Sequence, residues 1–228
     1  MKNLTIILWT CVIGIQVIYA QIVPYPTDSE ILDVNDVSFR VNSGGDLSWD
    51  LVGFPQCEIP KGSGNHTLFA GSLWIGGLDA KGNLHTAAST YRQAGIDFWP
   101  GPTAQTYDAN YWNRYGKVWK LSADEIATHQ QNYNQPGYQA PFDLLDWPAN
   151  GNTANGEPEQ LAPFFDQNAN GLYEPDSGDY PLIPGDEAMY LIYSDEHFPY
   201  FETVCLRTVI EVRQMVYAYD TIPGNPID

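Results

Sequence analysis

Cysteine is scarce in this chain of 228 residues, which contains only three. Cys11 lies in the apolar start of the chain, so Cys57 and Cys205 form the one pair beyond it. In an exported protein an even pair favours one disulfide, here closing a very long loop, and two separate thiols are the alternative. The two do not stand at zinc-ligand spacing, which argues against a zinc site built on cysteine.

Positive charge is also scarce, because ten Lys and Arg stand against 28 Asp and Glu, a net charge of −18. The basic residues are scattered, whereas a nucleic-acid partner needs basic clusters that release counterions. Aromatic residues make up 14% of the chain and charged residues only 17%, which is not the composition of a disordered acidic tail. We therefore expect a globular protein with an acidic surface, no nucleic-acid partner, and divalent cations as its counter-charge.

Sequence motifs of catalysis are missing. The four histidines form no HxH or HExxH pattern, and no phosphate loop or dinucleotide fingerprint occurs. Ser63 stands between two glycines but lacks the full Gly-x-Ser-x-Gly elbow.

Acids beside aromatic rings are the remaining setting for chemistry, because aromatic faces stack on sugar rings and glycoside hydrolysis needs two nearby carboxyls. The best such settings are Asp97 beside Trp99, and Asp143 or Asp146 beside Trp147. No motif links these acids to one site, so we expect that the chain is not an enzyme.

The start of the chain has the features of a signal peptide. Lys2 precedes an apolar stretch over residues 4–17, and Ala20 ends an acceptable cleavage site. The stretch is too short for a transmembrane anchor, and residues 21–26 are not a stop-transfer flank. The sequence therefore predicts a signal peptide over residues 1–20, an exported domain over 21–228, and no membrane span after cleavage.

Short strand patterns and turn signals dominate the rest. Alternation predicts a hairpin over residues 37–49, a second over 67–92, and strands over 117–121, 188–193 and 209–219. Ser122 and Glu125 form a capping box that predicts one short helix, fading by Tyr133. Many short strands with one helix indicate a mainly β fold, a β-sandwich-like domain with long loops.

Residues 166–179 have the spacing of a calcium-binding loop. Asp166, Asn168 and Asn170 place side-chain oxygens at alternate positions, and a glycine at the sixth position permits the sharp turn. The carbonyl of Leu172 comes free as a further ligand, and Asp179 supplies the closing carboxylate, because only a serine stands at the twelfth position. Further candidate ligands are Asp176 and Asp186. The alternative is an Asx-rich turn whose side chains bond their own backbone.

Six segments carry a resemblance to a family. They are residues 58–67, 72–79, 88–93, 97–102, 161–164 and 178–181. In this order they resemble the N-terminal part of large secreted proteins of Bacteroidota that carry a C-terminal signal for type IX secretion. The resemblance runs from about Asp33 to Tyr219, and it implies delivery to the cell surface or beyond, without defining a biochemical role. No sorting domain is seen before Asp228, so we expect an N-terminal fragment of a larger protein, or else a periplasmic version.

Two functional hypotheses follow. The first is a non-enzymatic structural or adhesin-like surface module stabilised by Ca²⁺, with surface glycans or other cell-surface proteins as partners. The second is carbohydrate binding or glycoside hydrolysis through exposed Trp and Tyr and paired acids. The positions of four tryptophans discriminate between them, since rings lining a groove favour sugar binding and rings buried between sheets favour a structural role. These are Trp74, Trp99, Trp112 and Trp147.

Overall fold

The computed structural model describes residues 28–91 and 95–220 of the chain. The predicted signal peptide and its cleavage site lie outside the described residues. None of the helices in the described ranges is long and apolar enough to cross a membrane.

A central antiparallel sheet is built around β10 (Glu187–Ser194). β10 pairs along its whole length with β11 (Glu211–Ala218). On its other edge it pairs with β6 (Trp99–Pro100) and β7 (Trp119–Ser122). β10 is an almost continuous apolar run, and it is buried on both faces. A strand that alternated apolar and polar residues could be covered on one face only.

The residues of β10 divide between two hydrophobic clusters. Tyr190 and Ile192 belong to the first cluster, with Trp119, Leu144 and Trp147 among its members. The neighbours Met189, Leu191 and Tyr193 belong to the second, together with Leu32, Val41 and Phe98. Successive side chains of a strand point to opposite faces, so the two clusters lie on either side of the sheet.

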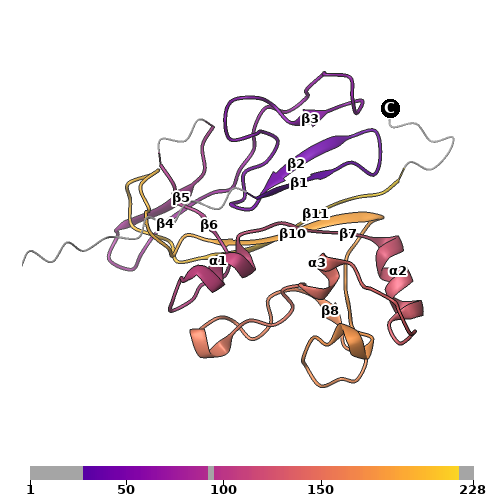
Figure 1. Ribbon diagram of the computed structural model, residues 1–228. Coiled ribbons are helices and arrows are strands. Elements are labelled where there is room, and N and C mark those ends of the chain that lie inside the picture. Colours follow the sequence, from indigo (N-terminus) through magenta and orange to yellow (C-terminus); the bar gives the residue numbers. More distant parts are fainter. Residues whose placement is uncertain (1–27, 92–94, 221–228) are drawn as a thin grey trace, which may run out of the picture.

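A three-stranded antiparallel sheet covers the second cluster. Its order is β1 (Ser29–Leu32), β2 (Ser38–Asn42) and β3 (Cys57–Glu58). Figure 1 shows this sheet on one side of β10 and β11, with the helices on the other side. The predicted mainly β fold is thus confirmed, with two sheets facing each other across one of the cores.

Three short helices cover the other face: α1 (Ala109–Tyr115), α2 (Ala123–Asn132) and α3 (Phe142–Leu145). The predicted helix is α2, and its capping box is confirmed. The amide of Glu125 donates to Ser122 Oγ over 3.2 Å, and the amide of Ser122 donates to Glu125 Oε2 over 2.8 Å. The sequence analysis predicted only this helix, and α1 and α3 are additional. Asp108 caps the N-terminus of α1 by accepting the amide of Tyr111.

The second predicted hairpin is β4 (Trp74–Leu78) with β5 (Leu84–Ala88), paired from Trp74 opposite Ala88 to Leu78 opposite Leu84. It is shorter than predicted, since residues 67–73 form no strand. The predicted return strand at residues 47–49 is reduced to single bridges. Two two-residue strands, β8 (Phe164–Phe165) and β9 (Tyr180–Pro181), close the base of the predicted calcium loop.

Cys57 and Cys205 are both free thiols, so the alternative of two separate cysteines holds and the disulfide does not form. Cys57 is buried in β3, with its Sγ 3.4 Å from Thr67 Oγ1.

Candidate functional site

The loop over residues 166–179 is closed at its base and turned sharply at its tip. β8 and β9 pair at the base, where the rings of Phe165 and Tyr180 stack with centroids 4.8 Å apart. Gly171 has a φ of +82°, a conformation that favours glycine, as the spacing of a calcium loop requires. A 3₁₀ turn, η2 (Pro175–Ser177), follows.

The three predicted side-chain ligands lie within one small network. Asp166 accepts the amide of Asn170 at Oδ1 over 3.3 Å and the amide of Gly171 at Oδ2 over 2.7 Å. Asn168 Oδ1 accepts the same Asn170 amide over 3.0 Å, and Asn170 Oδ1 accepts the amide of Leu172 over 2.7 Å. These are the bonds of an Asx-rich turn, yet a carboxylate or amide oxygen with one such partner keeps a second lone pair.

Glu174 completes this network and was not among the predicted ligands. Its Oε2 accepts the side-chain amide of Asn168 over 3.2 Å and that of Asn170 over 2.6 Å. Glu174 stands at the ninth position of a twelve-residue loop that begins at Asp166, and that position contributes a ligand in calcium loops. The spacing of the loop would therefore have predicted Glu174 as a further candidate ligand.

Asp179 lies at the base of the loop, fully buried. Its Oδ1 accepts the amide of Gln167 over 2.8 Å and its Oδ2 accepts the amide of Glu174 over 2.7 Å. The carboxylate thus joins the two ends of the loop. On the other side, the buried imidazole of His129 in α2 donates from Nε2 to the backbone carbonyl of Asp179 over 3.1 Å, which ties the loop to the helix.

The remaining candidate ligands are placed differently. The side chain of Leu172 is exposed, as expected of a residue that contributes only its carbonyl. Asp176 is exposed on η2. Asp186 instead accepts the amide of Asp220 over 2.8 Å, where β10 begins and β11 ends. Across residues 28–91 and 95–220, no three His, Cys, Asp or Glu gather as metal ligands do. The network in the loop contains two acids, Asp166 and Glu174, and its other oxygens come from the side-chain amides of Asn168 and Asn170.

The acids that stand beside aromatic rings in the sequence are engaged in hydrogen bonds with backbone amides or in an ion pair. Asp97 is buried and accepts the amides of Ala88 and Glu202 over 3.2 and 2.8 Å. Asp143 accepts the amide of Lys120 over 2.9 Å, and its burial raises the pKa of the carboxyl. Asp146 forms an ion pair with Lys117 over 2.5 Å. Asp146 and Trp147 both line a depression of about 510 Å³, in which Asp146 is the only acid of the lining.

Three of the four discriminating tryptophans are packed inside the protein. Trp99 and Trp147 are buried, and Trp112 lies partly buried against Trp99, with ring centroids 5.4 Å apart. Trp74 differs, because 69% of it is exposed. The positions of Trp99, Trp112 and Trp147 favour a structural role for those rings.

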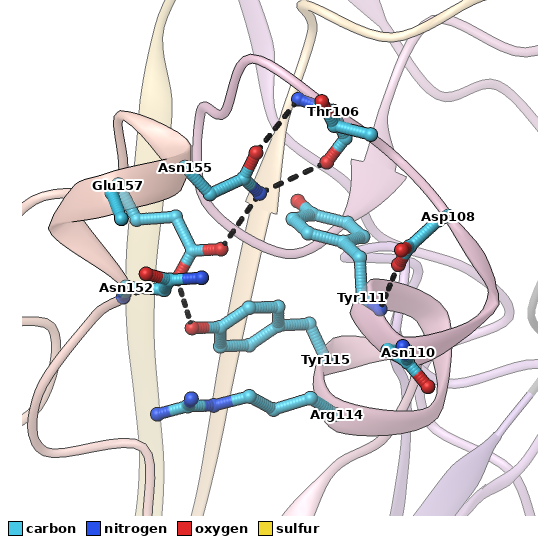
Figure 2. Close-up of a pocket in the computed structure, with 10 residues that line it drawn as sticks. Thr106, Asp108, Asn110, Tyr111, Arg114, Tyr115, Asn152, Asn155 and Glu157 are labelled. Atoms are coloured by element: carbon cyan, nitrogen blue, oxygen red, sulfur yellow. Dashed lines mark hydrogen bonds between the residues drawn. The ribbon is translucent and has the colours of Figure 1, made fainter.

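A cavity of about 440 Å³ lies between α1 and the 3₁₀ turn η1 (Thr153–Asn155). Figure 2 shows Glu157 pointing into it, where its Oε2 accepts the hydroxyl of Tyr115 over 2.5 Å. Asn155 donates to Glu157 Oε1 over 3.1 Å, so one carboxylate oxygen holds Glu157 to η1 and the other joins it to α1. Tyr111 and Tyr115 are buried. The cavity is also lined by a second acid, Asp108, which is engaged in capping α1 through the amide of Tyr111. Both acids of the lining are thus held in structural hydrogen bonds.

The strongest candidate site is thus the loop over residues 166–179, in which one hydrogen-bond network includes Asp166, Asn168, Asn170 and Glu174, with Asp179 at its base. In comparisons with known proteins, the chain matches no family model, no curated protein and no solved structure.

Proposed function

We propose that the chain is a non-enzymatic structural or adhesin-like module of a secreted or cell-surface protein, stabilised by one Ca²⁺ in the loop over residues 166–179. The observation that carries the proposal is the hydrogen-bond network in which Asn170 binds both Asp166 and Glu174, and Asn168 also binds Glu174. Oxygen ligands from carboxylates, amides and carbonyls are those that Ca²⁺ prefers. Export and surface location rest on the predicted signal peptide and on the resemblance described above. The location is the periplasm if no sorting domain follows.

The charge of the loop explains why a cation would stabilise it. Asp166 and Glu174 bring two negative charges to a chain with a net charge of −18, and their mutual repulsion opposes the closed loop. At present the side-chain amides of Asn168 and Asn170 soften that repulsion by donating to Glu174. A Ca²⁺ between the two carboxylates reduces their repulsion more strongly. Rotation of the side-chain amide groups of Asn168 and Asn170 then turns the amide oxygens toward the ion. Two charged ligands suit an affinity of about 10⁻⁴–10⁻³ M, as in extracellular modules.

The test is the thermal unfolding of the chain in Ca²⁺ and in EGTA. At 10 mM Ca²⁺, roughly ten to a hundred times the expected Kd, binding stabilises the folded state by about 1.4–2.7 kcal/mol. For a domain of this size that raises Tm by about 3–10 °C. Glu174→Gln and Asp166→Asn should each abolish most of the shift, whereas Asp176→Asn, on the exposed turn next to the network, should keep it. A melting curve that is the same in Ca²⁺ and EGTA for the unsubstituted chain would rule the proposal out.

Carbohydrate recognition is the second candidate function, and Trp74 is the observation that favours it. Tryptophan is enriched at binding surfaces because its ring combines a large apolar face with a polar N–H group, and Trp74 lines a cavity of about 330 Å³. Hydrolysis has less support, since Asp97, Asp143 and Asp146 are all occupied by backbone amides or an ion pair. Surface glycans are the corresponding partners, and a glycan array on the purified chain tests this function as a whole.

A further inference from the structure

Trp74 is exposed and yet fixed in place. Its indole Nε1 donates to the carbonyl oxygen of Ser89 over 2.8 Å and to Ser72 Oγ over 3.2 Å. The hydroxyl of Ser72 donates to the same Ser89 carbonyl. A side chain held by hydrogen bonds on its edge while its ring stays in water loses little conformational entropy when a ligand stacks on it.

This ring forms one wall of a cavity of about 330 Å³, which we call the Trp74 pocket. Three segments meet there. Leu47 and Gly71 exchange backbone hydrogen bonds of 2.8 and 2.9 Å, and Trp74 pairs with Ala88 in the hairpin of β4 and β5. Tyr91, which also lines the cavity, is held by edge-on contacts with Trp49 and Phe69, with centroids 5.3 and 4.8 Å away. The cavity is lined by Asp46, Trp49, Ala70, Gly71, Ser72, Trp74, Ser89, Thr90 and Tyr91.

The lining combines aromatic rings with hydroxyl groups and a single carboxylate. Trp74 and Tyr91 offer aromatic faces, while Ser72, Ser89 and Thr90 offer polar atoms around them. A ligand that matches both parts has an apolar ring face and a rim of hydroxyl groups, which describes a sugar residue. The volume lies at the small end of small-molecule sites and fits a single ring.

Charge decides which sugars fit. With a net charge of −18 and Asp46 within the lining, the protein repels uronates and sulfated sugars. The hydroxyl oxygens of Ser72 and Thr90 each keep an acceptor lone pair beside the hydrogen bonds that they make within the protein. A purely apolar ligand would displace water from these lone pairs and offer no hydrogen bond in return. The pocket therefore suits a neutral hexose unit.

The exposed apolar residues of the same hairpin raise the alternative of a general protein-docking face. Leu78 is 72% exposed at the far end of β4 and does not line the Trp74 pocket. It lines a different depression with Ile75 and His85. Leu78 is thus a matched control, because its removal takes a similar apolar side chain from the hairpin and leaves the pocket intact.

We propose that the Trp74 pocket is a binding subsite for one neutral hexose unit of a glycan, with Trp74 and Tyr91 as its stacking surfaces. The proposal rests on the second candidate function and locates it. It does not depend on Ca²⁺, since the hairpin and the loop over residues 166–179 lie well apart (Figure 1).

The experiment is isothermal titration calorimetry of the whole chain with cellohexaose, mannohexaose and maltohexaose, and with hexagalacturonate as the anionic probe. We expect at least one neutral hexaose to bind and hexagalacturonate not to bind. Trp74→Ala should lower the association constant by about tenfold or more. Trp74→Phe keeps a ring and should lower it less, and Leu78→Ala should leave it within about twofold, since that residue lies off the site. Because Trp74 and Leu78 are both exposed, thermal unfolding should confirm that each variant folds.

The outcomes separate the two claims. If no neutral hexaose binds the unsubstituted chain, carbohydrate recognition fails and this subsite fails with it. If a hexaose binds and Trp74→Ala binds it equally well, only the subsite is wrong. Equal losses in Trp74→Ala and Leu78→Ala, or preferred binding of hexagalacturonate, would also overturn the subsite.

Discussion

His197 is enclosed by aromatic rings in a way that makes its protonation costly. Its ring stacks on Trp99 with centroids 4.7 Å apart, and Tyr107 and Trp112 lie 4.5 and 4.8 Å away. Burial lowers the pKa of His197 from 6.5 to about 4, and the positive charge of Arg207 adds to this effect. A neutral imidazole is therefore the form that the folded protein requires.

This residue predicts a pH dependence of stability. Between pH 6.5 and about 4 the unfolded chain binds a proton at His197 that the folded chain does not bind, so acidification favours unfolding. The contribution of His197 is complete above pH 6.5 and falls by about 1–3 kcal/mol as the pH reaches 4. His197→Phe, which keeps a ring against Trp99, should lack this part of the loss. Urea unfolding of both chains from pH 7 to 4 measures the difference, and parallel curves for the two would contradict the prediction.

At the scale of residues, the sequence indicated which side chains of the loop lie together better than it indicated the environment of the histidines. Asp166, Asn168 and Asn170 lie within five positions, so their meeting depends on local geometry that spacing reveals. Glu174, at the ninth position, follows the same spacing rule, although it was not among the predicted ligands. The meeting of His197 with Trp99 joins residues nearly a hundred positions apart, and no local pattern in a single sequence encodes such a contact.

At the scale of elements, Asp179 makes the loop over residues 166–179 one closed unit. Both of its oxygens accept backbone amides, from Gln167 and Glu174, inside the protein. Asp179→Asn turns one oxygen into an amide that faces another N–H group, which should lower the free energy of unfolding by about 2–3 kcal/mol. The matched change Asp176→Asn, at an exposed position of the same loop, should alter it by less than about 0.5 kcal/mol.

Chemical unfolding in EGTA is the appropriate measurement for this pair, because it removes any contribution of a bound cation. A loss seen in EGTA assigns Asp179 to the backbone of the loop. If Asp179 served only as the closing metal ligand that the spacing suggested, the loss would appear in Ca²⁺ alone, and the two variants would unfold alike in EGTA.

The elements that the sequence predicted well are those with strong local signals. β10 and β11 were predicted within two residues at each end, because continuous or alternating apolar runs define strands. The helix α2 followed from its capping box. α1 was not found, since its aromatic residues have low helix propensity and Asp108 alone marks its start. The two-residue strands β3, β6, β8 and β9 exist only through their partners, and no pattern of two residues reveals them.

At the scale of the whole molecule, β10 makes the two layers depend on each other. Leu191 and Ile192 are adjacent and both fully buried, but one belongs to the core under the N-terminal sheet and the other to the core under the helices. If either layer unfolded alone, it would expose one face of β10 to water while the other face stayed covered. Because both faces of this one strand are buried, each by a different layer, the fold favours a single cooperative transition.

The coupling of the two layers through β10 gives a prediction that covers the entire described fold. Leu191→Ala and Ile192→Ala should each lower the free energy of unfolding by about 2–5 kcal/mol, since each leaves a cavity in a closed core. Both should shift one common transition, with thermal curves from tryptophan fluorescence and far-UV circular dichroism that coincide for each variant. Trp119 and Trp147 lie in the core beside Ile192, and Trp112 packs against it, whereas Trp49 is buried beside β2 of the N-terminal sheet. Fluorescence is therefore weighted toward the helical layer, whereas circular dichroism follows both sheets as well. Separate transitions in Leu191→Ala, with circular dichroism changing before fluorescence, would mean that the N-terminal sheet unfolds independently and that β10 does not couple the layers.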